Sequence, residues 1–193
     1  NMAASLKHEL GCVNHECPAY DILFGCPGWL QGVIQADQMI RSGEAVNVLV
    51  TGLEIASRML DPHDPDSMLL ADGCGACVIS RSEGNDVGIL SHTTFSHAMD
   101  DNRIIYLGPS LKPDVDGSCY FHMNGRAVYK YATEWVPKVI KNAMEKAGIE
   151  IGDVDIFLLH QANSKMLEAV AANFAAMCGV AADSLAGKIP STI

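Results

Sequence analysis

An α/β architecture with crossover connections is the fold class that this sequence predicts. Continuous apolar runs such as V-N-V-L-V-T-G, residues 46–52, are typical of strands covered on both faces. Segments with a helical spacing of apolar residues alternate with such runs and end at glycines, for example Gly43 and Gly148. With 49% hydrophobic and 19% charged residues, the 193-residue chain can bury one substantial core or two halves that share one.

The expected elements follow from this alternation. Helices are predicted to end near residues 6–10 and to span about residues 29–40, 125–147 and 164–177. Strands are predicted at residues 20–24, 46–52, 87–94 and 153–159, with two apolar pieces within 68–80. Residues 96–122 break the pattern with prolines, glycines and aspartates, and predict a long irregular connection between two parts of the chain.

Charge and cysteine content exclude several classes of protein. A net charge of -10 disfavours nucleic acid as a partner, because phosphate binding needs a basic face. No apolar run approaches the roughly 18 residues of a membrane helix. The seven cysteines are an odd number scattered through apolar segments, and the start of the chain is not typical of a signal peptide. We therefore expect reduced thiols in a cytoplasmic protein.

The stretch F-G-C-P-G-W, residues 24–29, places Cys26 in a glycine-flanked turn between a predicted strand and a helix. A helix N-terminus favours negative charge, and the thiolate is the reactive form of cysteine. Backbone N–H groups at the same place are suited to hold an oxyanion. Cys26 is therefore a candidate nucleophile. The local alternative is a buried structural thiol, since free cysteine is among the most buried residue types.

A second candidate is L-L-H-Q-A-N, residues 158–163, which places His160 at the carboxyl end of a predicted buried strand. Ligand sites of α/β proteins lie at such strand ends. Asn163 stands at the N-cap position of the last predicted helix. Structural roles are also open. His160 could be only a hydrogen-bonded polar residue, and Asn163 could be only a helix cap, although capping does not prevent a role in the chemistry.

Three other motifs carry weaker signals. The stretch D-G-C-G-A-C, residues 72–77, lacks the third glycine of a dinucleotide fingerprint and is expected to serve a turn or close backbone packing. Two histidines and two cysteines within residues 8–17 match no standard zinc spacing, so no metal is predicted. The acidic loop D-P-H-D-P-D, residues 61–66, lacks the glycine and the distal glutamate of a calcium loop and is predicted to be solvated.

Five motifs in the chain are specific when taken together: C-P-A-Y-D-I-L-F-G-C-P-G-W, V-L-V-T-G-L-E, A-D-G-C-G-A, M-N-G-R-A-V-Y-K and L-H-Q-A-N. In this order they resemble the β-ketoacyl-[acyl carrier protein] synthase III family of thiolase-fold condensing enzymes. The resemblance implies a thiolase-like α/β fold, layered α/β/α/β/α and incomplete at both termini. Residues 1–105 would form the rear part of its N-terminal half, and residues 106–193 the front part of its C-terminal half.

The same resemblance assigns roles to individual residues. Cys26 would be the acyl-accepting nucleophile, and His160 would help to decarboxylate a malonyl thioester. The residues implied to bind substrate are Asn163, Gly125 and Arg126. The residues implied to dock an acidic carrier protein are Lys130 and Lys165, which on local features are only solvated helix residues.

The implied activity is that of an acyltransferase that initiates fatty-acid synthesis. An acyl group passes from acyl-CoA to Cys26 and then condenses, with loss of CO2, with malonyl-[acyl carrier protein]. Acyl-CoA is a substrate in this scheme, and no cofactor or metal is implied. A homodimer without nucleic-acid or membrane partners is expected.

Some parts of the family pattern are not found in this chain. A G-N-[ST]-S motif with a second catalytic asparagine would follow a segment like residues 188–193, and the first strands would precede residue 1. Ala71 replaces a usual glycine, and Arg126 replaces a common asparagine. We therefore expect an internal segment of the fold that is inactive by itself. The alternatives are a thiolase-fold acyltransferase or hydroxymethylglutaryl-CoA synthase relative, and a catalytically dead, dimerising piece.

Overall fold

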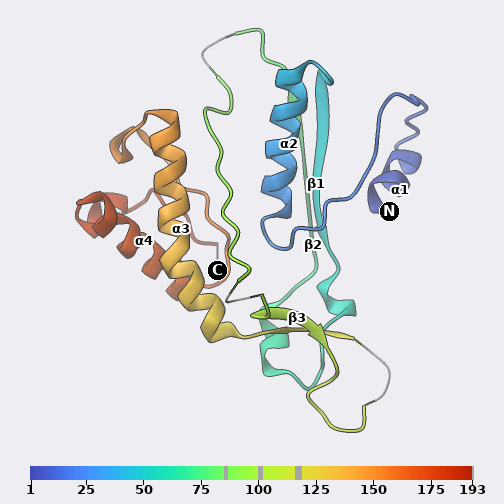
Figure 1. Ribbon diagram of the computed structural model, residues 1–193, viewed down its shortest axis with the longest axis vertical. Helices are drawn as coiled ribbons and strands as arrows, with labels where there is room; N and C mark the ends of the chain where they lie inside the picture. The colour runs from blue at the N-terminus through green and yellow to red at the C-terminus, as the bar shows by residue number, and fades with distance from the viewer. Residues whose placement is uncertain (85–86, 100–101, 116–118, 193) are drawn as a thin grey trace. The chain divides into compact units, whose positions relative to one another are not determined.

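The computed structural model describes residues 1–84, 87–99, 102–115 and 119–192 (Figure 1). Residues 100–101 and 116–118 of the predicted connection, and the last residue of the 188–193 segment, lie outside the described residues. The chain divides into two compact units. Unit 1 comprises Asn1–Gly52 and Cys74–Glu83, and unit 2 comprises Leu53–Gly73 and Gly84–Ile193.

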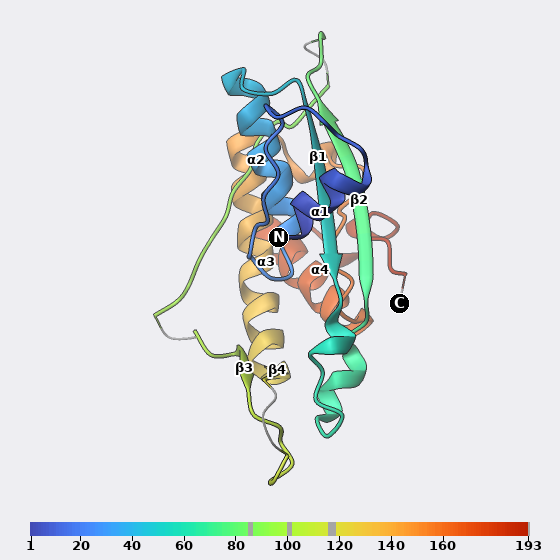
Figure 2. The same cartoon turned by 90° about the vertical axis from the view of Figure 1, so that its right-hand side faces the viewer.

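Unit 1 is built from a helix packed along a pair of strands. Its elements are α1 (Met2–Glu9), α2 (Gly28–Ser42), β1 (Asn47–Glu54) and β2 (Gly73–Ser80), with β1 and β2 hydrogen-bonded to each other. Helix α2 runs along β1 in both views (Figures 1 and 2). The approach is close at Gly32, where an added Cβ would lie 2.8 Å from Val50 Cγ1. A larger residue at position 32 would force the helix away from the strand.

Unit 2 contains a hairpin and two long helices. Its elements are β3 (Ile105–Gly108), β4 (Tyr120–Met123), α3 (Gly125–Ala147) and α4 (Ser164–Cys178). Strands β3 and β4 pair antiparallel, with Ile105 opposite Met123. The core that joins α3 and α4 consists of buried side chains from both helices and the loops beside them: Met144, Phe157, Phe174, Ala175 and Leu185.

The contact between α3 and α4 includes a polar bond at the middle of α3. Pro137 is buried inside that helix and has no N–H to donate to the carbonyl of Thr133, four residues earlier. Asn173 of α4 supplies the missing donor, with its Nδ2 2.9 Å from the Thr133 carbonyl oxygen. The proline and the asparagine therefore complement each other across the helix pair.

The helix predictions are confirmed within a few residues. Helices α2, α3 and α4 end before Gly43, Gly148 and Gly179, which all adopt positive φ and satisfy the last carbonyl groups. The strand at residues 46–52 is confirmed as β1. Close backbone packing at the D-G-C-G-A-C motif stays a prediction: a Cβ at Gly73 would lie 2.8 Å from the side-chain Oε1 of Glu54, and a Cβ at Gly75 would have no atom within 4 Å.

Several other predictions are wrong. Residues 20–24, 87–94 and 153–159 form no strand, and the predicted connection at 96–122 contains the β3–β4 hairpin. The apolar composition of these segments is that of strands, but no neighbouring strand forms a ladder with them in the described part of the chain. In segment 20–24, the Asp21 carboxylate instead accepts hydrogen bonds from the N–H groups of Ala3 and Met2, which lower its pKa and cap α1.

Candidate active site

Cys26 lies in a tight turn directly before helix α2. The turn is closed by a hydrogen bond of 2.8 Å from Gly28 N–H to the Gly25 carbonyl oxygen. Gly25 has a φ of 66°, in the left-handed region that glycine adopts without steric cost. Pro27 is the N-cap of α2 rather than its first helical residue, because the turn ends at Gly28.

The surroundings of Cys26 are open on the side-chain side and helical on the C-terminal side. Its side chain is exposed, so the alternative of a buried structural cysteine is wrong. The first turn of α2 follows immediately, so backbone N–H groups without a helical acceptor lie close to Cys26 in the chain. Such a position is suited to a nucleophile, because attack on an acyl carbonyl forms a tetrahedral oxyanion that backbone donors can hold.

His160 lies in an extended segment of unit 2 between the core and helix α4. Phe157 anchors this segment in the core, and its N–H donates to the Lys188 carbonyl oxygen at 2.8 Å. His160 is exposed, and its carbonyl oxygen accepts from Ala162 N–H at 3.0 Å. Asn163 caps α4 as predicted, with its Oδ1 accepting from Met166 N–H at 2.9 Å.

The remaining predicted site residues lie within the first two turns of α3 and the first turn of α4. Gly125 is the first residue of α3, and a Cβ there would lie 3.5 Å from Asp66 Oδ2. Arg126 and Lys130 follow on the same helix, and Lys165 is the second residue of α4. Arg126, Lys130 and Lys165 are exposed.

The predicted site residues of unit 2 fall into two groups, and Cys26 lies in unit 1. His160, Asn163 and Lys165 are brought together by one short stretch of unit 2, and Gly125, Arg126 and Lys130 by another.

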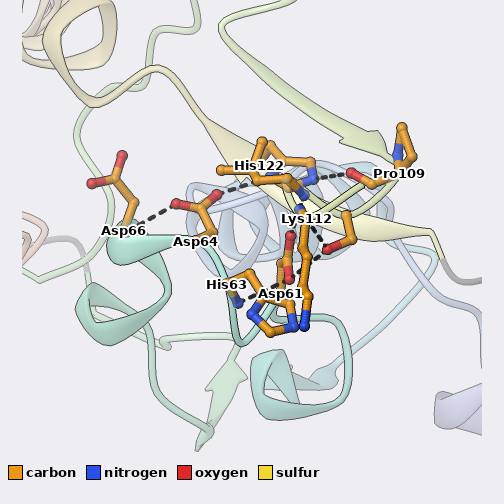
Figure 3. Close-up of polar contacts among 9 residues, drawn as sticks. Asp61, His63, Asp64, Asp66, Pro109, Lys112 and His122 are labelled. Carbon is orange, nitrogen blue, oxygen red and sulfur yellow. Dashed lines mark hydrogen bonds and ion pairs between the residues drawn. The ribbon is translucent and has the colours of Figure 1, made fainter. Parts of the chain in front are cut away.

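A buried polar cluster in unit 2 was missed by the sequence analysis (Figure 3). The acidic loop 61–66 was predicted to be solvated, but Asp61 is fully buried, and Asp64 and His122 are nearly so. His122 Nδ1 lies 2.8 Å from Asp64 Oδ2, and its Nε2 lies 2.8 Å from the Pro109 carbonyl oxygen. Both ring nitrogens face acceptors, so His122 donates both bonds only when protonated.

The electrostatics of the cluster agree with this geometry. The hydrogen bond to Asp64 raises the pKa of His122, against the opposing effect of burial. Burial of Asp61 opposes its ionisation, but hydrogen bonds from the N–H groups of His63 and Leu111 and from the Ser110 hydroxyl hold its pKa below the usual value. Lys112 N–H in turn donates to the Ser110 hydroxyl. The cluster ties loop 61–66 to β4 through His122 and to residues 109–111, which follow β3.

A local pattern in the sequence could have predicted the turns at Asp61 and Asp64. Asp61 and Asp64 each accept from the backbone N–H two residues later, those of His63 and Asp66, which is an Asx turn. Two aspartates spaced in this way predict the turns, whereas burial of their carboxylates depends on partners elsewhere in the chain. The partner His122 is 58 residues away from Asp64, and no local pattern connects them.

Metal and membrane features are not found in the part of the chain that the structure describes. No group of three or more His, Cys, Asp or Glu side chains there could hold a metal ion, so the histidines and cysteines of residues 8–17 form no such cluster. None of the described helices has the length and apolar content needed to cross a bilayer.

Solved structures of condensing enzymes share this fold. β-Ketoacyl-[acyl carrier protein] synthase III of Thermus thermophilus matches with a TM-score of 0.81 and 28% identity, over 100% of this chain and 57% of that one. The 3-oxoacyl-[acyl-carrier-protein] synthase III of Aquifex aeolicus matches with a TM-score of 0.80 and 29% identity, over 99% of this chain and 56% of that one. The chain therefore has the predicted thiolase-like α/β fold, over rather more than half of such a protein.

Sequence comparison narrows this class. Residues 20–98 match the family model of 3-oxoacyl-[acyl-carrier-protein (ACP)] synthase III. Curated relatives are the β-ketoacyl-[acyl-carrier-protein] synthase III of Porphyra umbilicalis, 35% identical over 88% of this chain and 53% of that protein, and that of Rhizorhabdus wittichii, 36% identical over 81% and 49%. The chain is thus a relative of the synthase III family, as its motifs predicted, and spans about half the length of the curated relatives it matches.

Proposed function

We propose that this chain carries the nucleophile and the histidine of a decarboxylating Claisen condensation that initiates fatty-acid synthesis. The observation that carries the proposal is the position of Cys26: exposed, in a glycine turn directly before α2, and within the residues that match the synthase III family model. His160 and Asn163, from the L-H-Q-A-N motif, are the matching residues of unit 2.

The reaction proceeds in two stages. The Cys26 thiolate attacks the thioester carbon of an acyl-CoA, and the first-turn N–H groups of α2 hold the oxyanion. The C–S bond to CoA then breaks, and the CoA thiolate takes up the proton that Cys26 gave up on ionising. Malonyl-[acyl carrier protein] then loses CO2, with His160 binding the thioester oxygen on which negative charge develops. The resulting carbanion attacks the acyl group, breaks its bond to Cys26 and releases a 3-oxoacyl product.

The remaining assignments follow from the same family relationship. Asn163, Gly125 and Arg126 bind the substrate, and Lys130 and Lys165 present exposed positive charge to an acidic carrier protein. Residues 1–105 correspond to the rear of the first half of the fold and residues 106–193 to the front of the second. We also propose that the protein is a cytoplasmic homodimer that needs no cofactor besides its acyl-CoA substrate.

The proposal is tested by mass spectrometry after incubation with acetyl-CoA, using the full open reading frame that contains this sequence. An acetyl adduct is expected on Cys26, no adduct in Cys26→Ala, and little modification of the other exposed cysteines, such as Cys12 and Cys74. An unmodified Cys26 would refute the function and favour a catalytically dead piece of the fold.

A second measurement separates the proposal from its nearest alternative. A thiolase-fold acyltransferase or a hydroxymethylglutaryl-CoA synthase relative also forms the acyl-cysteine but uses another acceptor. CO2 release from malonyl-[acyl carrier protein], coupled to 3-oxoacyl product, supports the condensation. Acylation of Cys26 without any CO2 release supports the alternative.

A further inference from the structure

The Gln161 side chain, next to His160, uses the full hydrogen-bonding capacity of its amide. Its Nε2 donates to the Leu159 carbonyl oxygen at 3.1 Å and to the Pro190 carbonyl oxygen at 3.2 Å. Its Oε1 accepts from Thr192 N–H at 3.0 Å and from the Thr192 hydroxyl at 3.3 Å. An amide has two N–H donors and two lone pairs on its oxygen, and all four are used here.

These bonds join two extended stretches that are distant in the sequence. One stretch is the segment around His160, and the other is residues 188–192. Gln161 lies 29 positions before Pro190 and 31 positions before Thr192 in the sequence. The same two stretches are also joined further from His160, by the Phe157 N–H bond to Lys188 and by Lys188 Nζ, which donates to the Val154 carbonyl oxygen. Gln161 makes the junction nearest to the histidine.

We propose that Gln161 is a positioning residue that holds the backbone of His160 in the geometry needed for decarboxylation. This inference rests on the proposed function of His160. Leu159 and Gln161 flank the histidine, and the Gln161 amide binds the Leu159 carbonyl oxygen directly. The Ala162 N–H bond to the His160 carbonyl oxygen completes the turn that leads into α4. These hydrogen bonds restrain the backbone on the N-terminal side of His160, at Leu159, and on its C-terminal side, at Ala162.

The four hydrogen bonds of the Gln161 side chain require a carboxamide, which both donates and accepts. A glutamate at position 161 has the same shape, but its carboxylate only accepts hydrogen bonds, so it would face the Leu159 and Pro190 carbonyl oxygens without a proton to donate. Protonation of such a glutamate restores one donor. Gln161→Glu therefore gives a defect that depends on pH, whereas Gln161→Ala gives one that does not.

The experiment measures the two half-reactions separately in the full open reading frame. Acetyl transfer from acetyl-CoA to Cys26 reports on the nucleophile, and CO2 release from malonyl-[acyl carrier protein] reports on His160. Asn173→Ala is the control, because it removes an amide-to-carbonyl bond from unit 2, as Gln161→Ala removes two, but lies on α4, outside the His160 segment. Circular dichroism at the assay temperature verifies that each variant is folded.

Gln161→Ala is expected to slow CO2 release about 10²-fold, as misplacement of a catalytic group by about 1 Å does, while Cys26 acetylation is unchanged. Gln161→Glu is expected to have a smaller defect at pH 6 than at pH 8, and Asn173→Ala is expected to change neither rate. If Gln161→Ala does not fold, the pH dependence of Gln161→Glu decides the question.

Two results would overturn the inference while the proposed function stands: unchanged CO2 release in Gln161→Ala, or equal loss of both half-reactions. An unaltered protein that neither acetylates Cys26 nor releases CO2 would overturn the function and this inference together.

Discussion

The turn around Cys26 is held by hydrogen bonds between residues close in the sequence, whereas the segment around His160 is held by bonds between distant residues. The Cys26 turn is closed by bonds that span three or four residues, from Gly28 to Gly25 and from Gln31 to Pro27. The His160 segment is held by bonds to residues about 30 positions later and by the packing of Phe157 in the core. The turn of the proposed nucleophile is therefore positioned by a short local sequence, whereas the His160 segment depends on assembly of the core of unit 2.

The largest effect on stability is expected from a substitution in the core that packs against the His160 segment. Phe174 is buried and packs edge-to-face on Phe157, with ring centroids 5.3 Å apart. Phe174→Ala is expected to lower the free energy of unfolding by about 3–5 kcal/mol, measured by urea denaturation, because it leaves a cavity. Leu158→Ala is the control: Leu158 lies two residues before His160 but is 82% exposed, and its loss should cost less than about 0.5 kcal/mol. Equal effects would contradict the long-range origin of the His160 geometry.

A backbone substitution tests the local side of the comparison. Gly25→Ala places an L-residue at a φ of 66° and is expected to cost about 1–2 kcal/mol in the same denaturation experiment. Gly28→Ala is the matched control, because Gly28 is helical and the nearest atom to an added Cβ is Phe24 Cβ at 3.9 Å. It should be neutral. A neutral Gly25→Ala would show that the turn does not need the left-handed residue.

Substitutions of Asn163 can separate its role as the N-cap of α4 from its proposed role in substrate binding. Asn163→Ala removes the bond to Met166 N–H and is expected to destabilise the protein by about 1 kcal/mol. Asn163→Asp retains a capping oxygen and should keep the stability within about 0.5 kcal/mol, since the two residues are comparable N-caps. If Asn163→Asp is stable but slow in condensation, the side chain has a role beyond capping. Loss of stability in Asn163→Asp would contradict this separation.

The smallest expected effect is a pH dependence caused by His122, whose contact with Asp64 is also long-range. Because the folded-state pKa of His122 is raised, its contribution to stability is complete below the unfolded value of about 6.5 and is lost as the pH rises through the folded value. Deprotonation leaves one hydrogen bond in place, so the loss is partial. His122→Asn should flatten this part of the stability–pH curve. An unchanged slope in His122→Asn would contradict the assignment, and the ring resonances of His122 in NMR titration give its pKa directly.

Helices and their ends were the most predictable part of this protein. Apolar spacing and a following glycine located α2, α3 and α4, because helical hydrogen bonds and caps are satisfied within a few residues. The N-cap role of Asn163 was predictable for the same reason. The exposed thiol of Cys26 follows from an equally local feature, the glycine turn before a helix.

Strands and buried polar groups were less predictable, because their partners are distant in the sequence. Residues 153–159 have the composition of a strand, yet their anchors are a core phenylalanine and one bond to Lys188. The β3–β4 hairpin arose in a segment whose prolines and glycines predicted irregular structure. Asp61 and Asp64 looked like solvated loop residues until His122 and Ser110 were brought to them by folding.

The sequence by itself determined the helices, their caps, the candidate nucleophile and the family relationship. Each of these depends on residues within one turn of the chain or on the order of short motifs. Only the tertiary structure decided which segments pair as strands, which carboxylates are buried and how the His160 segment is clamped by Gln161. Those features depend on hydrogen-bond partners about 30 to 60 residues away, and only folding brings such partners together.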